Sequence, residues 1–520
     1  GNGTCKKGDD GRDPEWHGNK EMRCDGLAIL DGEFKKPNEY FCPSGLCFVS
    51  IAVLKLAEAF SPRLTKEKIP LCVLFTVHGE LQQGGRYSAM GRSLVVMLSL
   101  QLVFQLGLSG QLQASPDYDL APVLYSASKD DNTITRIQAA MDAQTFNLSG
   151  SSSAEVLRSL LDELGISVSS QVLVFSKTSL QRKMITPTNP RAIYFNSDFY
   201  VGYVPGGLIE IVACDDPKGM MFYSLDVNAE PEKRRFLRSQ ECMSCHANKN
   251  TMNVPGLLVR SVFTEQDGQP LLSWGSLLTT PGSPVEDRWG GWYVTGRQGQ
   301  TRHMGNQWVS NRDAGRDGYE ATTGQNVTDL NVFFDTNKHL ADTSDILALM
   351  IMEHQIHAHN TLSAAKVSYL RSAYLNKAIH HGKYDVSSPS AQKMIVATAD
   401  SILKMLLFAD EVELPEDGID GSDLYRDSFI GQGLSHDGHS LRDLRLERRL
   451  FKYRCSFMIH SKSFEQLPEE IKTCVLEKLH AIVTGEDDMP GFPSLSSREK
   501  ERIHGILSHT HAAYQRVVSR

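Results

Sequence analysis

Two cysteines and a histidine, in the string Cys242-Met243-Ser244-Cys245-His246, have the residue types and the spacing for covalent cofactor chemistry. The two thiols of such a string can add to the vinyl groups of a haem as thioethers, and the imidazole that follows becomes the proximal ligand of the iron. With 10 Cys and 17 His among 520 residues, about 0.006 such strings are expected by chance. Chance therefore does not explain the string, and the sequence predicts one covalently bound haem c at Cys242, Cys245 and His246.

Two other kinds of site use the same residue types. A zinc ribbon needs a second pair of cysteines, and the sequence contains no other Cys-x-x-Cys. A thioredoxin-like dithiol would lie between a strand and a helix of a βαβ unit, and it stays open as an alternative. Because Cys-x-x-Cys-His occurs once, haem attachment would make this a monohaem chain rather than a multihaem one.

A haem held by His246 leaves one axial position on the iron, and the occupant of that position decides the chemistry. A methionine or a second histidine suits electron transfer, whereas an empty or water-filled position lets the iron meet peroxide or another small ligand. His303, in the glycine-flanked segment Gly296–Asn306, is the preferred sixth ligand, because flanking glycines allow close backbone approach. Met304, next to it, and Met252, close to the motif, are the alternatives.

A second histidine cluster lies in the string Glu353-His354-Gln355-Ile356-His357-Ala358-His359-Asn360. On a helix, residues three or four positions apart share a face, so Glu353, His354 and His357 can act together. That spacing can hold a metal, or supply a distal haem ligand or a proton-transferring base. Helix histidines more often make hydrogen bonds at a domain interface, and this structural interpretation is the favoured one.

The densest aromatic stretch is Asp287–Tyr293, which contains Trp289 and Trp292. Its rings can form a wall for a porphyrin, while Arg288 or Arg260 pairs with the propionates. Ordinary core packing explains the same stretch at least equally well.

The first part of the chain predicts export. A methionine at 90, one positive charge, an apolar run of about 15 residues and a small residue before a polar segment are typical of a secretory signal. We expect residues 1–89 to be a spurious upstream extension and residues 90–114 to be a signal peptide; a buried helix in a genuine N-terminal domain is the alternative. A periplasmic or otherwise exported location in a bacterium agrees with haem attachment, since bacteria attach c-type haem outside the cytoplasmic membrane.

The remaining residues divide by pattern into an α/β N-terminal part (115–230), a haem-attachment region (231–340) and a helical domain (341–520). Strands are predicted at Ala192–Phe195, Phe199–Val204 and other short segments around the motif, with turn residues between them. Long helical patterns follow, at Ile346–Ile379 and, among others, at Leu441–Met458. The fold class is therefore α+β: an antiparallel β-rich segment carries the haem motif, and a mostly helical C-terminal domain follows it.

Composition excludes some functions. A formal net charge of −8 argues against a nucleic-acid binder, which would show a basic patch or arm. No uninterrupted apolar stretch of about 20 residues occurs, so we do not expect an integral membrane protein after signal cleavage.

The Cys242–His246 string is similar to that of c-type cytochromes, which implies thioether roles for both cysteines and the proximal role for the histidine. The segments Gln171–Leu180, Arg288–Gly296, Glu353–Gln355 and Tyr453–Ser456 also look like those of large exported bacterial proteins labelled only as containing a cytochrome c domain. That broader resemblance spans about 115–520. It implies haem binding and electron transfer, and it supplies no substrate.

Three functions follow from these observations. The first is an exported monohaem c-type cytochrome that transfers electrons to or from a redox partner protein. The second is a haem-dependent oxidoreductase of the peroxidase type, and the third is a haem-based redox or gas sensor. The bulk of the chain favours the second over a simple carrier, because a carrier needs little beyond a haem-sized domain.

Overall fold

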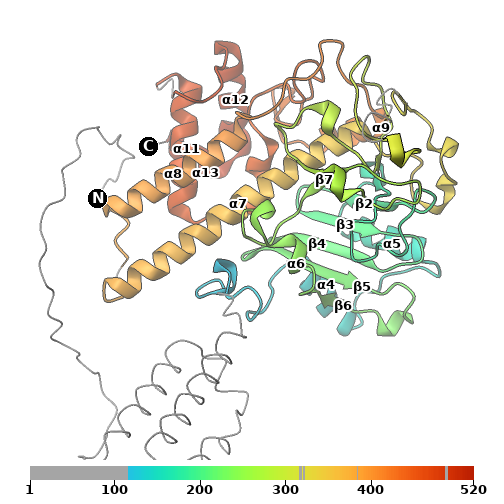
Figure 1. Cartoon of the computed structure of the whole chain (residues 1–520). Helices are drawn as coiled ribbons and strands as arrows, with labels where there is room; N and C mark the ends of the chain where they lie inside the picture. Colours follow the sequence, from blue (N-terminus) through green and yellow to red (C-terminus); the bar gives the residue numbers. More distant parts are fainter. Residues whose placement is uncertain (1–114, 315–318, 320–322, 383, 487–489, 520) are drawn as a thin grey trace, which may run out of the picture. The chain divides into compact units, whose positions relative to one another are not determined.

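A computed structural model describes residues 115–314, 319, 323–382, 384–486 and 490–519. These residues belong to one compact unit (Figure 1). The expected upstream extension at 1–89 and the expected signal peptide at 90–114 lie outside the described residues.

A seven-stranded antiparallel sheet forms the first half of this unit, with strand order β6-β5-β4-β3-β2-β1-β9. The strands are β1 (Val172–Val174), β2 (Arg191–Phe195), β3 (Phe199–Tyr203), β4 (Ile209–Asp216), β5 (Gly219–Leu225), β6 (Phe236–Arg238) and β9 (Trp292–Tyr293). Two hairpin-like pairs lie outside it: β7 (Val259–Val262) with β8 (Ser276–Thr279), and β10 (Ser435–His436) with β11 (His439–Ser440). Strands β1 to β6 precede the Cys242–His246 motif in the chain and β9 follows it. The predicted antiparallel β-rich part of an α+β fold is therefore confirmed.

Successive side chains along each strand point to opposite faces of the sheet, and both faces are buried. Val212, Phe222 and Trp292 pack toward the long helix of the second half. Their neighbours on the opposite face, among them Ile211 and Tyr293, pack against the N-terminal helices. Both faces are covered, so the strands are apolar at nearly every position.

The N-terminal helices are α4 (Thr133–Asp142) and α5 (Ser153–Glu163). Each begins with a capping box. The side chains of Asn132 and Ser152 accept a hydrogen bond from the backbone N–H of the third helical residue. The side chain of that third residue accepts a hydrogen bond from the backbone N–H of Asn132 or Ser152. Side chains thus satisfy backbone N–H groups at the start of both helices.

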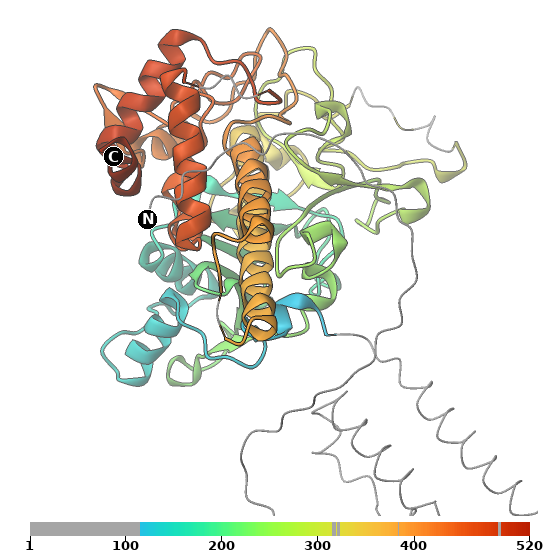
Figure 2. The same cartoon turned by 90° about the vertical axis from the view of Figure 1, so that its left-hand side faces the viewer.

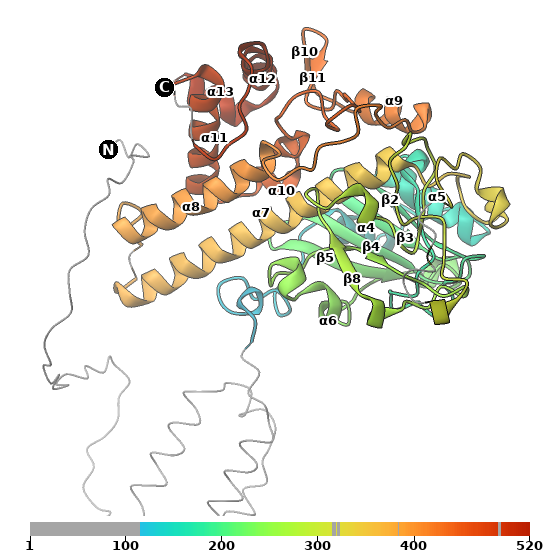
Figure 3. The same cartoon turned by 45° about the horizontal axis from the view of Figure 1, so that its top comes forward.

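Helix α7 (Ile346–Ile379) is the central element of the second half. Its N-cap, Asp345, accepts hydrogen bonds from the backbone N–H groups of Leu347 and Ala348. Nearly every residue from Ile346 to Ser363 is buried, because the sheet covers one side of the helix and later helices cover another. Figures 1 and 3 show α7 between these layers, and Figure 2, which looks roughly along it, shows the C-terminal helices to one side.

The C-terminal region is helical, as predicted. Its helices are α8 (Pro389–Leu406), α9 (Asp423–Gly431), α10 (Lys462–Glu465), α11 (Glu469–Thr484), α12 (Ser497–Thr510) and α13 (Ala512–Val518). Helix α8 packs on both α7 and α11, and α12 and α13 pack on α11.

The helix predicted at Leu441–Met458 is wrong. This segment is irregular up to the short 3-10 helix at Phe457–His460, and Leu446 and Arg448 have φ angles of 68° and 60°. Left-handed backbone at two positions breaks an α-helix. Tyr453, Cys455 and Phe457 are buried, and so are Ser456 and Met458. This irregular segment therefore lies within the core.

Within the described ranges, no helix is long and apolar enough to cross a membrane.

Candidate functional site

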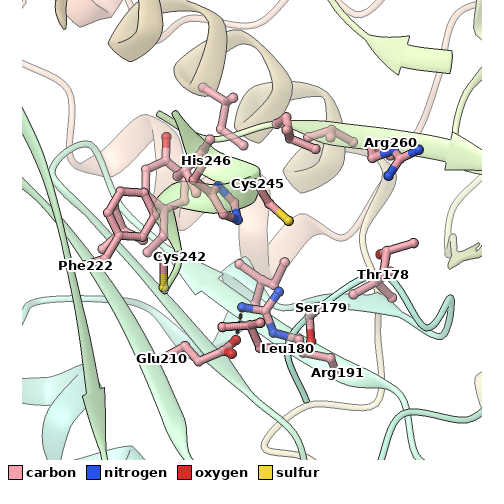
Figure 4. A pocket seen from close by; sticks show the side chains of 18 of the residues that line it. Thr178, Ser179, Leu180, Arg191, Glu210, Phe222, Cys242, Cys245, His246 and Arg260 are labelled. Atoms are coloured by element: carbon pink, nitrogen blue, oxygen red, sulfur yellow. Dashed lines mark ion pairs between the residues drawn. The ribbon is translucent and has the colours of Figure 1, made fainter. Parts of the chain in front are cut away.

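A cavity lies between the sheet, the Cys242–His246 motif and α7, and it contains all three motif side chains (Figure 4). Its volume is about 210 Å³, against roughly 300–1,000 Å³ for common ligand sites. Much of its wall is apolar, and is made by Val174, Ile193, Val212, Phe222, Leu257, Val259, Trp292, Met352 and Ile356. A lining of this kind suits a mostly apolar ligand.

The motif itself forms a single helical turn, α6 (Met243–His246), with Cys242 at its N-cap. The backbone N–H of His246 donates to the carbonyl of Cys242 at 2.9 Å. Helical spacing places positions 242, 245 and 246 on one side of the turn. As a result both thiols and the imidazole line the same cavity, with Cys242 half-buried and Cys245 exposed.

His246 has the hydrogen bonding of a metal-ligating histidine. Its Nδ1 lies 2.8 Å from the carbonyl oxygen of Gly256. A carbonyl can only accept, so Nδ1 carries the proton and Nε2 keeps its lone pair. A bond of this kind fixes both the tautomer and the orientation of a ligating imidazole.

The electrostatic environment keeps this imidazole neutral. Burial lowers the pKa of His246, and the hydrogen bond to Gly256 opposes that effect without cancelling it. Burial also raises the pKa of the Cys242 thiol, whose Sγ donates to Ser239 Oγ at 3.3 Å. A neutral imidazole is the form that binds iron.

Asn360 on α7 holds the loop that positions His246. Its Oδ1 accepts from the backbone N–H of Leu257, and its Nδ2 donates to the Leu257 carbonyl at 2.7 Å. Gly256 precedes Leu257, and a Cβ at position 256 would collide with the side-chain amide of Asn360. Glycine therefore lets Asn360 come close to the loop backbone. The backbone N–H of Gly256 in turn donates to the His246 carbonyl at 2.7 Å.

Across the cavity from His246 lies an ion pair that crosses strand β3. Arg191 Nη2 on β2 and Glu210 Oε2 on β4 are 2.5 Å apart, and their side chains are 21% and 24% exposed. Figure 4 shows the pair facing the imidazole. Sequence reasoning missed both residues, because they lie far from the motif along the chain and belong to no pattern of their own.

Three predicted sixth ligands lie elsewhere, and none of them is among the residues that line the cavity. His303 is 1% exposed, and its Nδ1 accepts from the backbone N–H of Gly305. Its ring packs edge-on against Trp289 at 5.3 Å, and burial lowers its pKa to about 3. Met304 Sδ accepts from Ser261 Oγ at 3.6 Å, and Met252 is 42% exposed. The structure thus does not bring His303 and His246 to one cavity.

Met352 is the sulfur-bearing residue that α7 contributes to the cavity wall, and no pattern in the sequence singles it out. It is 1% exposed. Its position two residues before His354 placed it outside the histidine pattern, although the same stretch of helix carries both.

The helix histidines bond to separate neighbours instead of to one another. His354 Nε2 is 2.6 Å from Ser456 Oγ, and His359 Nδ1 is 2.9 Å from Ser463 Oγ. Both contacts join α7 to the C-terminal segments. Among the described residues, no group of three or more His, Cys, Asp and Glu side chains is placed to hold a metal ion.

The two arginines considered for the propionates have different positions. Arg288 is buried and paired with Glu353 at 2.7 Å, so it is not available to a ligand. Arg260 lines the cavity, where its guanidinium donates to Ser276 Oγ. Trp292 lines the cavity too, whereas Trp289 and Tyr293 are core residues.

No family model, curated protein or solved structure matches this chain.

Proposed function

We propose that this chain is an exported monohaem c-type cytochrome that exchanges electrons with a redox partner protein. Cys242 and Cys245 would form the two thioethers, and His246 would be the proximal ligand. The observation that carries the proposal is the cavity in which both thiols meet an imidazole whose Nε2 is free while its Nδ1 is held by Gly256. When bound, the haem supplies a one-electron redox centre.

The protein's own residues would hold that centre in three ways. Gly256 and Asn360 orient the imidazole through the chain of hydrogen bonds described above. Apolar side chains such as Phe222, whose ring centroid is 5.2 Å from that of His246, exclude water from the proximal side. Arg260 and the exposed Arg182 stand at the cavity, and each offers a guanidinium for propionate binding.

A haem-dependent oxidoreductase of the peroxidase type and a haem-based sensor remain the second candidates. The observation that favours them is the Arg191–Glu210 ion pair inside the cavity, because a carrier with a saturated iron needs no polar pair there. All three functions share covalent haem attachment, so that is tested first.

The test uses the full chain expressed with a c-type haem maturation system and exported to the periplasm. We expect haem to stay with the polypeptide after denaturation, the intact mass to rise by one haem, and the pyridine haemochrome to show the c-type signature. Voltammetry should show one reversible one-electron couple. Loss of both thioethers in Cys242→Ala/Cys245→Ala should release the haem on denaturation.

Ser244→Ala is the matched control, because Ser244 lies within the same turn and leaves the Cys-x-x-Cys-His string intact. It should retain covalent haem at the wild-type level. A wild-type chain that matures without covalent haem would remove the basis of the proposal.

A further inference from the structure

The Arg191–Glu210 pair lines the cavity beside the motif. Arg191 Nη2 is paired with Glu210, and the buried Nε of Arg191 has no hydrogen-bond partner among the described residues. Glu210 thus leaves part of the hydrogen-bonding capacity of the guanidinium unused. Because the Arg191 side chain is 21% exposed, a group bound in the cavity can contact it.

Strand β3 leaves room for this arrangement at Gly202. The register pairs Gly202 with Ile193 on β2 and with Glu210 on β4, so the Arg191 side chain crosses over the glycine to reach Glu210. A Cβ at position 202 would collide with the guanidinium. The position of Arg191 thus depends on a residue without a side chain on the strand between the two partners.

The pair lies opposite the imidazole instead of at the rim of the cavity. Burial is the main cause that lowers the pKa of His246, but the charge of Arg191 lowers it too and the charge of Glu210 raises it, so both act on the ring. The same two charges act on the Cys242 thiol. Figure 4 shows the pair and the imidazole on facing sides of the space.

A propionate has other guanidinium groups to bind in this cavity. Arg260 and Arg182 line it, and among the described residues neither makes an ion pair with a carboxylate. Arg191, which faces the imidazole, is therefore left for a ligand at the iron.

Building on the proposed function, we propose that Arg191 binds the outer atom of a small anionic ligand on the iron face opposite His246. The sixth position of the iron would then be open to exchange. The ligand would be a small anion such as cyanide, or a small molecule that becomes negatively charged when bound to iron, such as a reduced oxygen species. Arg191 is the contact residue. Glu210 and Gly202 are positioning residues, since they act through the guanidinium.

Met352 is the protein side chain that could take the sixth position of the iron in place of a small ligand. Besides the motif, it supplies the one thioether or imidazole among the described residues that line the cavity. A Met352–iron bond would saturate the iron and leave Arg191 without a ligand to contact.

The experiment measures ligand binding to the holoprotein by absorption spectroscopy. Ferric protein is titrated with potassium cyanide, whose bound form is an anion, and ferrous protein with carbon monoxide, which is neutral and accepts hydrogen bonds weakly. The variants are Arg191→Leu, Gly202→Ala, Glu210→Gln and Met352→Leu. Arg235→Leu is the arginine control, because Arg235 belongs to an exposed ion pair with Asp142 and does not line the cavity.

We expect the ferric wild type to be high-spin and to bind cyanide, and the ferrous wild type to bind carbon monoxide. Arg191→Leu removes a charge-assisted hydrogen bond and should weaken cyanide binding about 10- to 100-fold, with carbon monoxide binding changed less than about threefold. Gly202→Ala displaces the guanidinium and should also weaken cyanide binding, and Glu210→Gln should show a smaller loss. Arg235→Leu and Met352→Leu should bind cyanide as wild type does.

Two results would overturn the inference. One is a low-spin wild type that binds neither ligand and becomes high-spin in Met352→Leu, since Met352 would then be the sixth ligand. The other is an equal loss of cyanide and carbon monoxide binding in Arg191→Leu. Failure of the proposed function is separate, because it would appear earlier as a chain without covalent haem.

Discussion

Glu353 is the residue whose replacement should destabilise the fold most clearly. It lies in the N-terminal part of α7, and its side chain is 1% exposed. Its carboxylate is 2.7 Å from Arg288 Nη1 and 2.8 Å from Trp289 Nε1. The other donors of Arg288 are taken by the carbonyls of Ser283 and Pro281, so the guanidinium is fixed in place. Burial raises the pKa of Glu353, and the charge of Arg288 opposes that by favouring the carboxylate.

Glu353→Gln keeps the shape of the side chain but removes its charge, which leaves a buried guanidinium without a counterion. Breaking a buried pair in this way costs about 3–5 kcal/mol. The free energy of unfolding is measured by urea titration, followed by far-ultraviolet circular dichroism and by tryptophan fluorescence. Coincident transitions for the two probes are needed for the comparison.

The control is an exposed pair of the same chemistry. Lys462 and Glu465 are 2.8 Å apart, with side chains 56% and 67% exposed. Glu465→Gln should cost less than about 1 kcal/mol, because water replaces the lost contact. The double variant Arg288→Met/Glu353→Gln should recover much of the loss, since no buried charge remains. If Glu353→Gln cost no more than Glu465→Gln, the reasoning that this pair stabilises the contact between α7 and its neighbours would be refuted.

Two further predictions concern α7 and its neighbours. Burial raises the pKa of Asp345 to about 6, above the ordinary 3.8, so the native state binds this proton more tightly than the unfolded chain; stability from this group is present below about pH 4 and is lost as pH rises through 6. The difference in unfolding free energy between wild type and Asp345→Asn should therefore change by about 2 kcal/mol between pH 4 and pH 7, and a difference that stays flat would contradict the assignment. Asn360→Ala leaves the N–H and carbonyl of Leu257 unpaired and should lower the free energy of unfolding by about 1–3 kcal/mol in the same urea assay. An unchanged urea midpoint would show that Asn360 does not hold the loop after the motif.

Local sequence determined the elements and the motif chemistry of this protein. Short segments separated by turn residues predicted the strands, because this signal comes from neighbours in the chain. The 34-residue α7 was predicted at its observed bounds. The spacing of Cys242, Cys245 and His246 was enough to bring the three side chains to one side of a helical turn.

Tertiary structure decided what surrounds the motif. Arg191, Gly202 and Glu210 lie on three different strands, and only the antiparallel register places them side by side. Arg288 and Arg260 looked equivalent in sequence, yet one is neutralised by Glu353 and the other lines the cavity. Likewise Met352 reaches the cavity while His303 is enclosed beside Trp289. Hydrogen bonding within a helical turn is set by residues a few positions apart, whereas the walls of a cavity come from segments more than a hundred residues apart, whose contacts form only when the sheet and α7 pack together.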